Sequence, residues 1–145
     1  MSFVHRPILM TDAGAVVSGH HKASEAGAAV LRAGGNAMDA AIAASAVLAV
    51  AIPHMNGIGG DCIALYFDAA SGKTIANNGS GRAPAAASAA ALRQLGHQLS
   101  PTRGPLASSV FGLVDAWGRC LARVGSRPLA DLFLPAAELA EQGGP

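Results

Sequence analysis

Residues 36–66 read NAMDAAIAASAVLAVAIPHMNGIGGDCIALY and contain an apolar segment, a proline, a glycine-rich turn and a second apolar segment, in that order. The first segment is almost entirely Ala, Ile, Val, Leu and Met, so hardly any face of a helix built from it favours water. Asn36 is suited to cap the start of this helix, and Asp39 places negative charge in the first turn, where the helix dipole favours it. Pro53 ends the segment, because proline lacks an N–H and disfavours helix at the residue before it. The stretch therefore predicts a helix buried inside a layer, followed by a strand.

The composition limits the classes of partner. Ten basic and nine acidic side chains give a net charge of +1, so the chain has no broad basic field to hold nucleic acid or anionic lipid. The apolar segment is too short for a membrane span, which takes about 20 predominantly apolar residues, and Asp39 and Ser45 interrupt it. Only 13% of the residues are charged, which leaves little charge to cover a free surface. We expect no nucleic acid or membrane partner, and we expect part of the surface to face another chain.

The two cysteines, Cys62 and Cys120, lie inside apolar runs and lack CxxC spacing. We expect buried free thiols at both positions. The first 14 residues, MSFVHRPILMTDAG, lack the apolar core of a secretory signal. These features favour a cytoplasmic location, whereas a signal upstream of residue 1 would indicate the periplasm.

The residues before the central helix predict an irregular lead-in over residues 1–14, a short buried strand over residues 15–18 and a helix over residues 24–33. Gly34-Gly35 then closes this helix with a left-handed cap, which residues with a Cβ disfavour. We expect the two helices to form a compact pair, since only two or three residues connect them.

His20 and His21 raise the question of a metal site, because His21 and Glu25 have helical i, i+4 spacing. A catalytic zinc needs a third protein ligand, and the sequence contains no HExxH or similar pattern. We therefore predict no metal or cofactor, and we interpret the histidines as a turn pair that leads into a helix.

The turn HMNGIGGD, residues 54–61, resembles a phosphate-binding loop only in its glycine content. Phosphate loops run from strand to glycine loop to helix, so that the helix N-terminus meets the anion. The order here is helix, loop, strand, and the spacing fits neither GxGxxG nor the Walker pattern. We instead expect Gly59 and Gly60 to allow close backbone approach or a positive φ where the chain enters a sheet.

The next segment predicts a hairpin. Residues 62–67 form a continuous apolar run, which is typical of a strand covered on both faces, and residues 68–73 and 74–76 predict a turn and a returning strand. The loop NNGSGRAP, residues 77–84, follows. Arg82 in this loop offers a guanidinium fork to a carboxylate, with Ser80 and backbone N–H groups nearby. An ordinary surface arginine is an equally good interpretation of Arg82.

The second half of the chain predicts helices over residues 85–95, 110–124 and 129–140, with a connector over residues 96–105. Pro135 predicts a break or a new start within the last of them. The apolar stripe expected on the helix at 110–124 consists of Val114, Trp117, Leu121 and Val124.

Two motifs in order, GGNAMDAA at residues 34–41 and GIGG at residues 57–60, make residues 18–73 resemble the N-terminal region of the gamma-glutamyltransferase family. The likeness continues through GSGRAP, FGLVDAW and LFLPAAELAEQGGP, so that it spans about residues 16–145. The chain is therefore identified as similar to the opening of that family's large subunit.

The resemblance implies an α/β (α+β) fold, the N-terminal-nucleophile hydrolase αββα sandwich. Residues 1–145 would be its N-terminal, helix-rich part, without an internal domain boundary. Such enzymes cut their own precursor, and the exposed N-terminal threonine of the small subunit attacks a γ-glutamyl or related amide with its own amine as the base. That threonine lies outside this stretch, so the resemblance implies no catalytic residue and no activity for the stretch alone. The implied partners are a γ-glutamyl or acyl-amide substrate, the rest of the large subunit and the small subunit.

One departure from the family pattern concerns the substrate. Family transferases carry an arginine four residues before the proline of Ala-Pro and use it to grip the glutamyl α-carboxylate. Ser80 stands at that place here, and Arg82 lies two residues later. Either Arg82 reaches the same carboxylate from a rearranged loop, or the pocket accepts another acyl group, as in cephalosporin-acylase-like members. Arg82 and Ser80 are thus the candidate substrate-binding residues. Phe111 replaces the proline usual in the family, within a packing segment.

The alternative belongs to another class of function. In it the chain is a truncated, non-catalytic homologue that acts as a binding or structural module through its apolar surface. A threonine at a downstream autocleavage point distinguishes the enzyme from this alternative.

Overall fold

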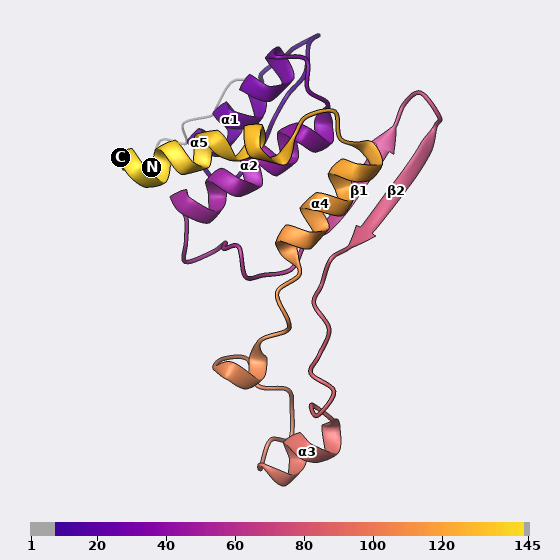
Figure 1. The fold of residues 1–145 in the computed structure, drawn as a ribbon, viewed down its shortest axis with the longest axis vertical. Helices are drawn as coiled ribbons and strands as arrows, with labels where there is room; N and C mark the ends of the chain where they lie inside the picture. The colour runs from indigo at the N-terminus through magenta and orange to yellow at the C-terminus, as the bar shows by residue number, and fades with distance from the viewer. Residues whose placement is uncertain (1–7, 144–145) are drawn as a thin grey trace.

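The computed structural model describes residues 8–143 (Figure 1). Within them it contains helices α1 (His21–Arg32) and α2 (Ala37–Ala51), strands β1 (Ile63–Asp68) and β2 (Lys73–Asn78), helix α3 (Ala89–Gln94), the 3-10 turn η1 (Pro105–Ala107), and helices α4 (Leu113–Val124) and α5 (Leu129–Gln142). Residues 8–14 have no regular structure, as predicted for the lead-in. The rest of that prediction, residues 1–7, lies outside the described part, as do residues 144–145. None of the helices within residues 8–143 is long and apolar enough to span a bilayer.

Helix α2 is the buried helix that the central stretch predicts. Helices α1 and α5 both pack against it, and Ile42, Ala43 and Val47 are at most 2% exposed. Its N-terminus carries a capping box, in which the Asn36 side chain accepts from the Asp39 N–H at 3.0 Å and the Asp39 side chain accepts from the Asn36 N–H at 2.9 Å. The helix ends at the residue before Ile52, as the proline predicts.

Helix α1 begins at His21, three residues before the predicted start. The difference arises because the His20 ring caps the helix: its Nδ1 accepts from the Lys22 N–H at 3.3 Å, the role that Ser or Asp more often fills. The predicted left-handed cap at the other end is confirmed. Gly34 has a φ of +82°, and the N–H of Gly35 donates to the Val30 carbonyl at 2.9 Å, as in a Schellman motif.

A fully buried carboxylate, Asp39, joins the α1–α2 corner to the α4–α5 corner. Besides the Asn36 N–H, it accepts hydrogen bonds from the Ser126 N–H at 3.0 Å, the Ser126 hydroxyl and the Arg127 N–H at 3.3 Å. Asn36 reinforces the same junction, because its Nδ2 donates to the Val124 carbonyl at 2.6 Å. The sequence predicts only a helix-dipole role for Asp39, and the structure gives it a role in tertiary packing as well.

Strands β1 and β2 form the predicted antiparallel hairpin, with Ile63 opposite Asn78 and Asp68 opposite Lys73. One face of the hairpin packs toward the helices through half-buried residues such as Tyr66. The other face exposes Ile63, Leu65 and Phe67, which are 76%, 76% and 64% exposed. The prediction that the strand at 62–67 is covered on both faces is therefore wrong within residues 8–143. Alternate residues of a strand point to opposite faces, and none of the described residues covers the outer one.

The predicted buried strand at residues 15–18 is also wrong. These residues have no regular structure, and Val17 is 95% exposed. A strand exists only where a neighbour accepts and donates its backbone hydrogen bonds, and no described segment pairs with this one.

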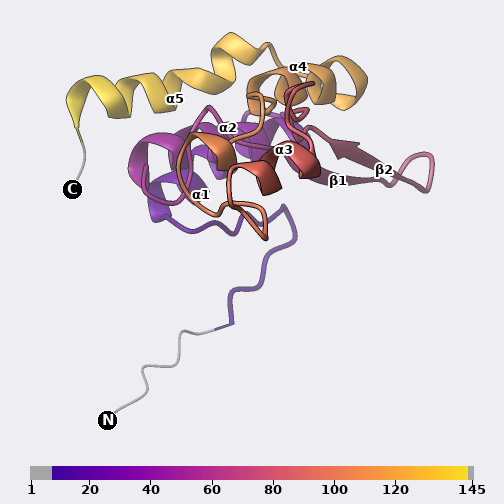
Figure 2. The same ribbon diagram turned by 90° about the horizontal axis from the view of Figure 1, so that it is seen from below.

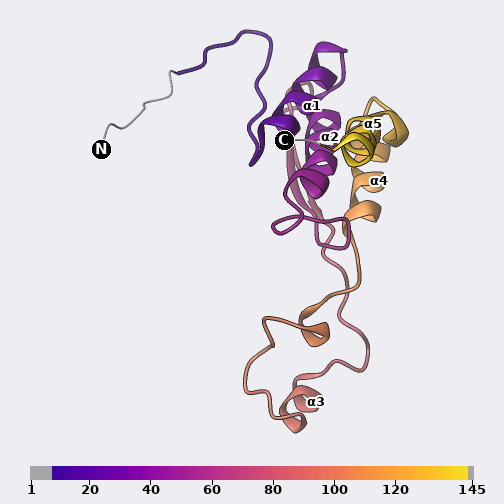
Figure 3. The same cartoon turned by 90° about the vertical axis from the view of Figure 1, so that its left-hand side faces the viewer.

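The segment that carries α3 and η1 projects away from the remaining elements (Figures 1 and 3). The helix predicted over residues 85–95 is present but shorter, because the Ser88 hydroxyl caps it by accepting from the Ala91 N–H at 3.1 Å. None of the residues of α3 is buried. Leu95 and Leu99, which follow it, are 65% and 86% exposed.

Helix α4 starts at Leu113 rather than at the predicted residue 110, because the N–H groups of Val110 and Gly112 donate to the carbonyls of Arg82 and Gly60 instead of joining the helix. Its buried face centres on Trp117, whose ring meets Phe133 edge-on at a centroid distance of 5.3 Å. In the predicted stripe, Trp117 is buried, Leu121 and Val124 are half-buried, and Val114 is 43% exposed, so the prediction is wrong for Val114.

Helix α5 continues through Pro135, which contradicts the predicted break (Figure 2). Proline removes the hydrogen bond to the carbonyl four residues earlier. That carbonyl belongs to Asp131, an exposed residue, so it is left to hydrogen-bond with water. Packing of α5 against α2 keeps the helix continuous.

Both cysteines are free, as predicted. The predicted burial is confirmed for Cys120 but is wrong for Cys62, which is half-buried. Burial raises the pKa of both thiols, and the nearby Cys120 raises the pKa of Cys62 further. The structure thus brings together two thiols that are far apart in the sequence.

The first prediction concerns the buried carboxylate. In the full-length protein, Asp39→Asn turns a carboxylate oxygen into an amide group that faces N–H and O–H donors. We expect a cost of about 1–3 kcal/mol for each donor left without an acceptor, measured as a lowered melting temperature. The matched control is Asp115→Asn, which breaks the exposed i, i+4 ion pair with Arg119 and should cost only about 0.3–0.5 kcal/mol. Equal effects of the two substitutions would contradict the assigned role.

The second prediction is the pH dependence that Asp39 creates. Burial acts to raise the pKa of this carboxyl, but the hydrogen bonds from Ser126, Asn36 and Arg127 outweigh it and hold the pKa below its ordinary value. A lowered pKa contributes stability above the unfolded-state value of about 3.9 and loses it as the pH falls through the folded-state value. Melting temperatures between pH 7 and pH 3 should therefore fall less steeply for Asp39→Asn than for the unsubstituted protein.

Candidate functional site

The loop at residues 79–84 leaves the end of β2 and crosses the segment that leads into α4. The Gly79 N–H donates to the Cys62 carbonyl at 2.7 Å, and the Val110 N–H donates to the Arg82 carbonyl at 3.2 Å. The Gly60 carbonyl accepts from the N–H of Leu113 at 2.9 Å, which satisfies a free donor at the start of α4. Backbone hydrogen bonds thus fasten three segments that are distant in the sequence.

The crossing requires residues without a side chain. A Cβ at Gly81 would lie 1.4 Å from the Val110 carbonyl oxygen, and a Cβ at Gly79 would lie 2.3 Å from the Cβ of Ala116. In the glycine-rich turn, close approach is confirmed at Gly59, where a Cβ would lie 3.3 Å from the Phe111 ring. The same prediction is wrong at Gly60, which has neither a positive φ nor a tight contact. Gly60 contributes its carbonyl instead, which accepts from the Leu113 N–H.

Arg82 and Ser80, the two residues singled out in the sequence, share this loop and are both exposed. The Ser80 N–H donates to the Asn78 side chain at 3.0 Å. Within residues 8–143 the Arg82 guanidinium has no carboxylate within ion-pair distance, and the one ion pair found there joins Arg119 to Asp115. The Arg82 backbone is therefore fixed while its charged group remains open to a ligand.

Asp61 and Ser109 also belong to the site, although the sequence analysis did not identify them as functional. The Asp61 Oδ1 accepts from the Gly81 N–H at 3.3 Å and from the Ser109 hydroxyl at 3.0 Å. These partners lie 20 and 48 residues away along the chain, so no local spacing reveals them. The only local signal is an aspartate placed directly after the GIGG turn.

The histidine pair lies at the turn that leads into α1, as the sequence predicts. His20 caps α1 and His21 begins it, and their rings are 4.4 Å apart between centroids. In the part of the chain that the structure describes, no three His, Cys, Asp or Glu side chains lie close enough together to hold a metal ion.

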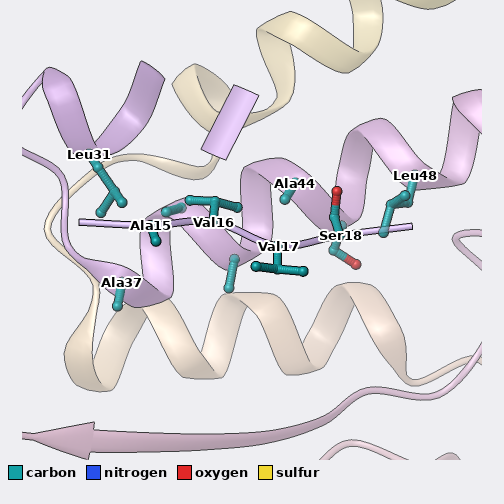
Figure 4. A pocket seen from close by; sticks show the side chains of 11 residues that line it. Ala15, Val16, Val17, Ser18, Leu31, Ala37, Ala44 and Leu48 are labelled. Atoms are coloured by element: carbon teal, nitrogen blue, oxygen red, sulfur yellow. The ribbon is translucent and has the colours of Figure 1, made fainter. Parts of the chain in front are cut away.

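A groove of about 360 Å³ lies between residues 15–18 and helix α2 (Figure 4). Its lining is mostly Ala, Val and Leu, with hydroxyls from Ser18 and Ser45 and no titratable side chain. The Ser18 hydroxyl is engaged by the His20 carbonyl at 2.8 Å and the Ser24 hydroxyl at 2.7 Å. The groove therefore offers neither a base nor a charge for catalysis, and the loop at residues 79–84 remains the candidate site.

Comparison with known proteins shows which family and which curated proteins the chain resembles in sequence. The family model described as Gamma-glutamyltranspeptidase matches residues 23–145. The chain is 43% identical over 131 residues to the glutathione hydrolase-like YwrD proenzyme of Bacillus subtilis, covering 90% of this chain and 25% of that protein. It is 42% identical over 127 residues to the oxamate amidohydrolase proenzyme of Klebsiella pneumoniae, covering 87% of this chain and 23% of that protein. The chain thus spans about a quarter of the length of these curated relatives.

Solved structures of the same family have a similar fold. The crystal structure of the Helicobacter pylori gamma-glutamyltranspeptidase superimposes with a TM-score of 0.85 at 37% identity, over 95% of this chain and 40% of that one. The predicted fold class is confirmed, since the described residues form a helix-rich part of the N-terminal-nucleophile hydrolase fold of such structures. The family match over most of the chain and the agreement in fold lead to one conclusion: the chain belongs to the gamma-glutamyltranspeptidase family.

Proposed function

We propose that residues 1–145 are the N-terminal portion, without an internal domain boundary, of the large subunit of a self-processing amide hydrolase or acyltransferase. In this proposal the enzyme removes or transfers a γ-glutamyl or related acyl group. The nucleophile is an N-terminal threonine outside residues 1–145, with its own amine as the base. Support comes from the membership of the chain in the family and from relatives whose names include the word proenzyme. A cytoplasmic location is part of the same proposal and rests on the sequence alone.

The proposal rests on Arg82, whose main chain is held by hydrogen bonds and whose guanidinium has no carboxylate partner within residues 8–143. A guanidinium presents parallel N–H donors that match the two oxygens of a carboxylate, and such a pair fixes orientation as well as charge. The main chain around Arg82 is held at Gly79 and at the Arg82 carbonyl, while no described carboxylate pairs with the side chain. We assign Arg82 the role of binding the acyl group's carboxylate, with the Ser80 hydroxyl as a second polar contact.

The position of Arg82 bears on which acyl groups the site accepts. The family transferases place their arginine where this chain has Ser80. The two relatives described above carry different names, glutathione hydrolase-like and oxamate amidohydrolase. This difference favours a binding loop that varies with the acyl group. We therefore propose an acyl group that bears a carboxylate, with the γ-glutamyl group as one member of that class.

The exposed apolar surface supports partners from the same protein. The outer face of the hairpin presents Ile63, Leu65 and Phe67, and the projecting segment presents Leu95 and Leu99. Covering such side chains releases about 25 cal/mol per Å² of apolar area. We propose that the rest of the large subunit and the small subunit cover them. A non-catalytic module would bury the same surface, so turnover by the full-length protein decides between the two functions.

The third prediction tests Arg82. In the full-length protein, Arg82→Ala should lower kcat/KM for an acyl anilide with a carboxylate on the acyl group by about 100-fold, since it removes a charge-assisted pair worth about 2.7 kcal/mol. The loss should appear mainly in KM, because the carboxylate is remote from the reacting carbonyl.

The matched controls are a second substrate and a second arginine. For the analogue whose carboxylate is replaced by a primary amide, Arg82→Ala should change kcat/KM little. Arg119→Ala removes an exposed arginine that pairs with Asp115 on α4 and should behave as the unsubstituted protein. An Arg82→Ala variant that still prefers the charged substrate as strongly as before would remove Arg82 from the site.

A further inference from the structure

We propose that Asp61 is a positioning residue that sets the direction in which Arg82 presents its guanidinium to the substrate. This inference rests on the proposed function of Arg82 and adds a residue with no place in the family motifs quoted above. Asp61 acts in it as a hydrogen-bond acceptor and touches neither the substrate nor the reacting atoms.

Asp61 holds the Ser80–Gly81 peptide, which lies one peptide before the one that joins Gly81 to Arg82. The Asp61 Oδ1 accepts from the Gly81 N–H at 3.3 Å. Gly81 directly precedes Arg82, and a Cβ there would lie 1.4 Å from the Val110 carbonyl oxygen, so the Gly81 Cα is already in close contact with the neighbouring segment. The hydrogen bond to the carboxylate holds the Ser80–Gly81 peptide in its orientation.

The peptide after Arg82 is held as well. Its carbonyl accepts from the Val110 N–H at 3.2 Å. The residue before Val110 is Ser109, which is half-buried and donates its hydroxyl to the same Asp61 oxygen at 3.0 Å. One carboxylate oxygen therefore connects the loop to the segment that holds the other side of Arg82. With the Ser80–Gly81 and Arg82–Ala83 peptides both held, the Cα atoms of Gly81 and Arg82 are held in place and the direction of the Arg82 Cα–Cβ bond is restricted.

The contacts of Asp61 differ from those of an ordinary surface carboxylate. Asp115, also exposed, pairs with a cation, Arg119, at 2.8 Å. Asp61 has no cationic partner within residues 8–143, and its oxygen is occupied by two neutral donors. What the loop requires from residue 61 is an acceptor oxygen rather than a negative charge. Asparagine keeps such an oxygen and alanine does not.

The experiment compares Asp61→Ala, Asp61→Asn and Arg82→Ala in the full-length protein. The readout is the ratio of kcat/KM for the carboxylate-bearing acyl anilide to that for its amide analogue. For Asp61→Ala we expect this ratio to fall about 10-fold, mainly through KM, because a guanidinium displaced by a fraction of an ångström pairs less well. For Asp61→Asn we expect the ratio to stay within about 3-fold of the unsubstituted value, because the acceptor is retained. Asp115→Asn is the control for loss of an exposed carboxylate, and melting temperatures show whether each variant is folded.

The outcomes separate the inference from the function on which it rests. An unchanged ratio for Asp61→Ala, with a collapsed ratio for Arg82→Ala, overturns the role of Asp61 and leaves Arg82 in place. Equal losses for Asp61→Asn and Asp61→Ala show that the charge is what matters and overturn positioning through an acceptor. An unchanged ratio for Arg82→Ala overturns the proposed function and the inference together.

Discussion

The described part of the chain depends on one buried charge. Asp39 lies in the first turn of α2 with its side chain fully buried, and it accepts hydrogen bonds from the corner that precedes α2 and from the corner between α4 and α5. A buried carboxylate is costly unless hydrogen bonds replace the water it has lost. The two corners must therefore meet for the charge to be tolerated. This condition links GGNAMDAA to Ser126 and Arg127, more than 80 residues later, and places α5 against α2.

The second constraint is the backbone crossing at the end of the hairpin, and it connects the fold to function. The end of α4 is held at the Asp39 junction through Val124, and its start lies beside the turn at residues 57–61 and the loop at residues 79–84. Glycine at residues 79 and 81 lets the backbones touch, and main-chain hydrogen bonds then fix the loop. A loop held by main-chain hydrogen bonds, whose arginine has no ion-pair partner among residues 8–143, loses less conformational entropy on binding than a mobile loop. The same packing that buries the helices thus preorganises the candidate binding residue.

Sequence reasoning succeeded where the signal is local. The cap at Asn36, the left-handed cap at Gly34 and the hairpin follow from short-range rules and are present in the structure. It failed where a distant segment decides: the strand at residues 15–18 has no described partner, Pro135 is tolerated because α5 packs against α2, and residues 110–112 are held by the crossing instead of joining α4. For the site, the type and position of Arg82 suggested a carboxylate ligand. The contacts of Asp61 join residues up to 48 positions apart and could not be deduced from spacing.

The central claim is that these residues belong to the large subunit of an enzyme that cuts itself to expose a nucleophilic threonine. Intact-mass measurement of the protein expressed from the complete gene tests it most directly. The account predicts two masses that sum to that of the precursor, with threonine as the first residue of the smaller product. Replacing that threonine with alanine should leave a single uncut chain. A single, stable mass for the unsubstituted protein would contradict the claim and leave a binding or structural role for the surface described above.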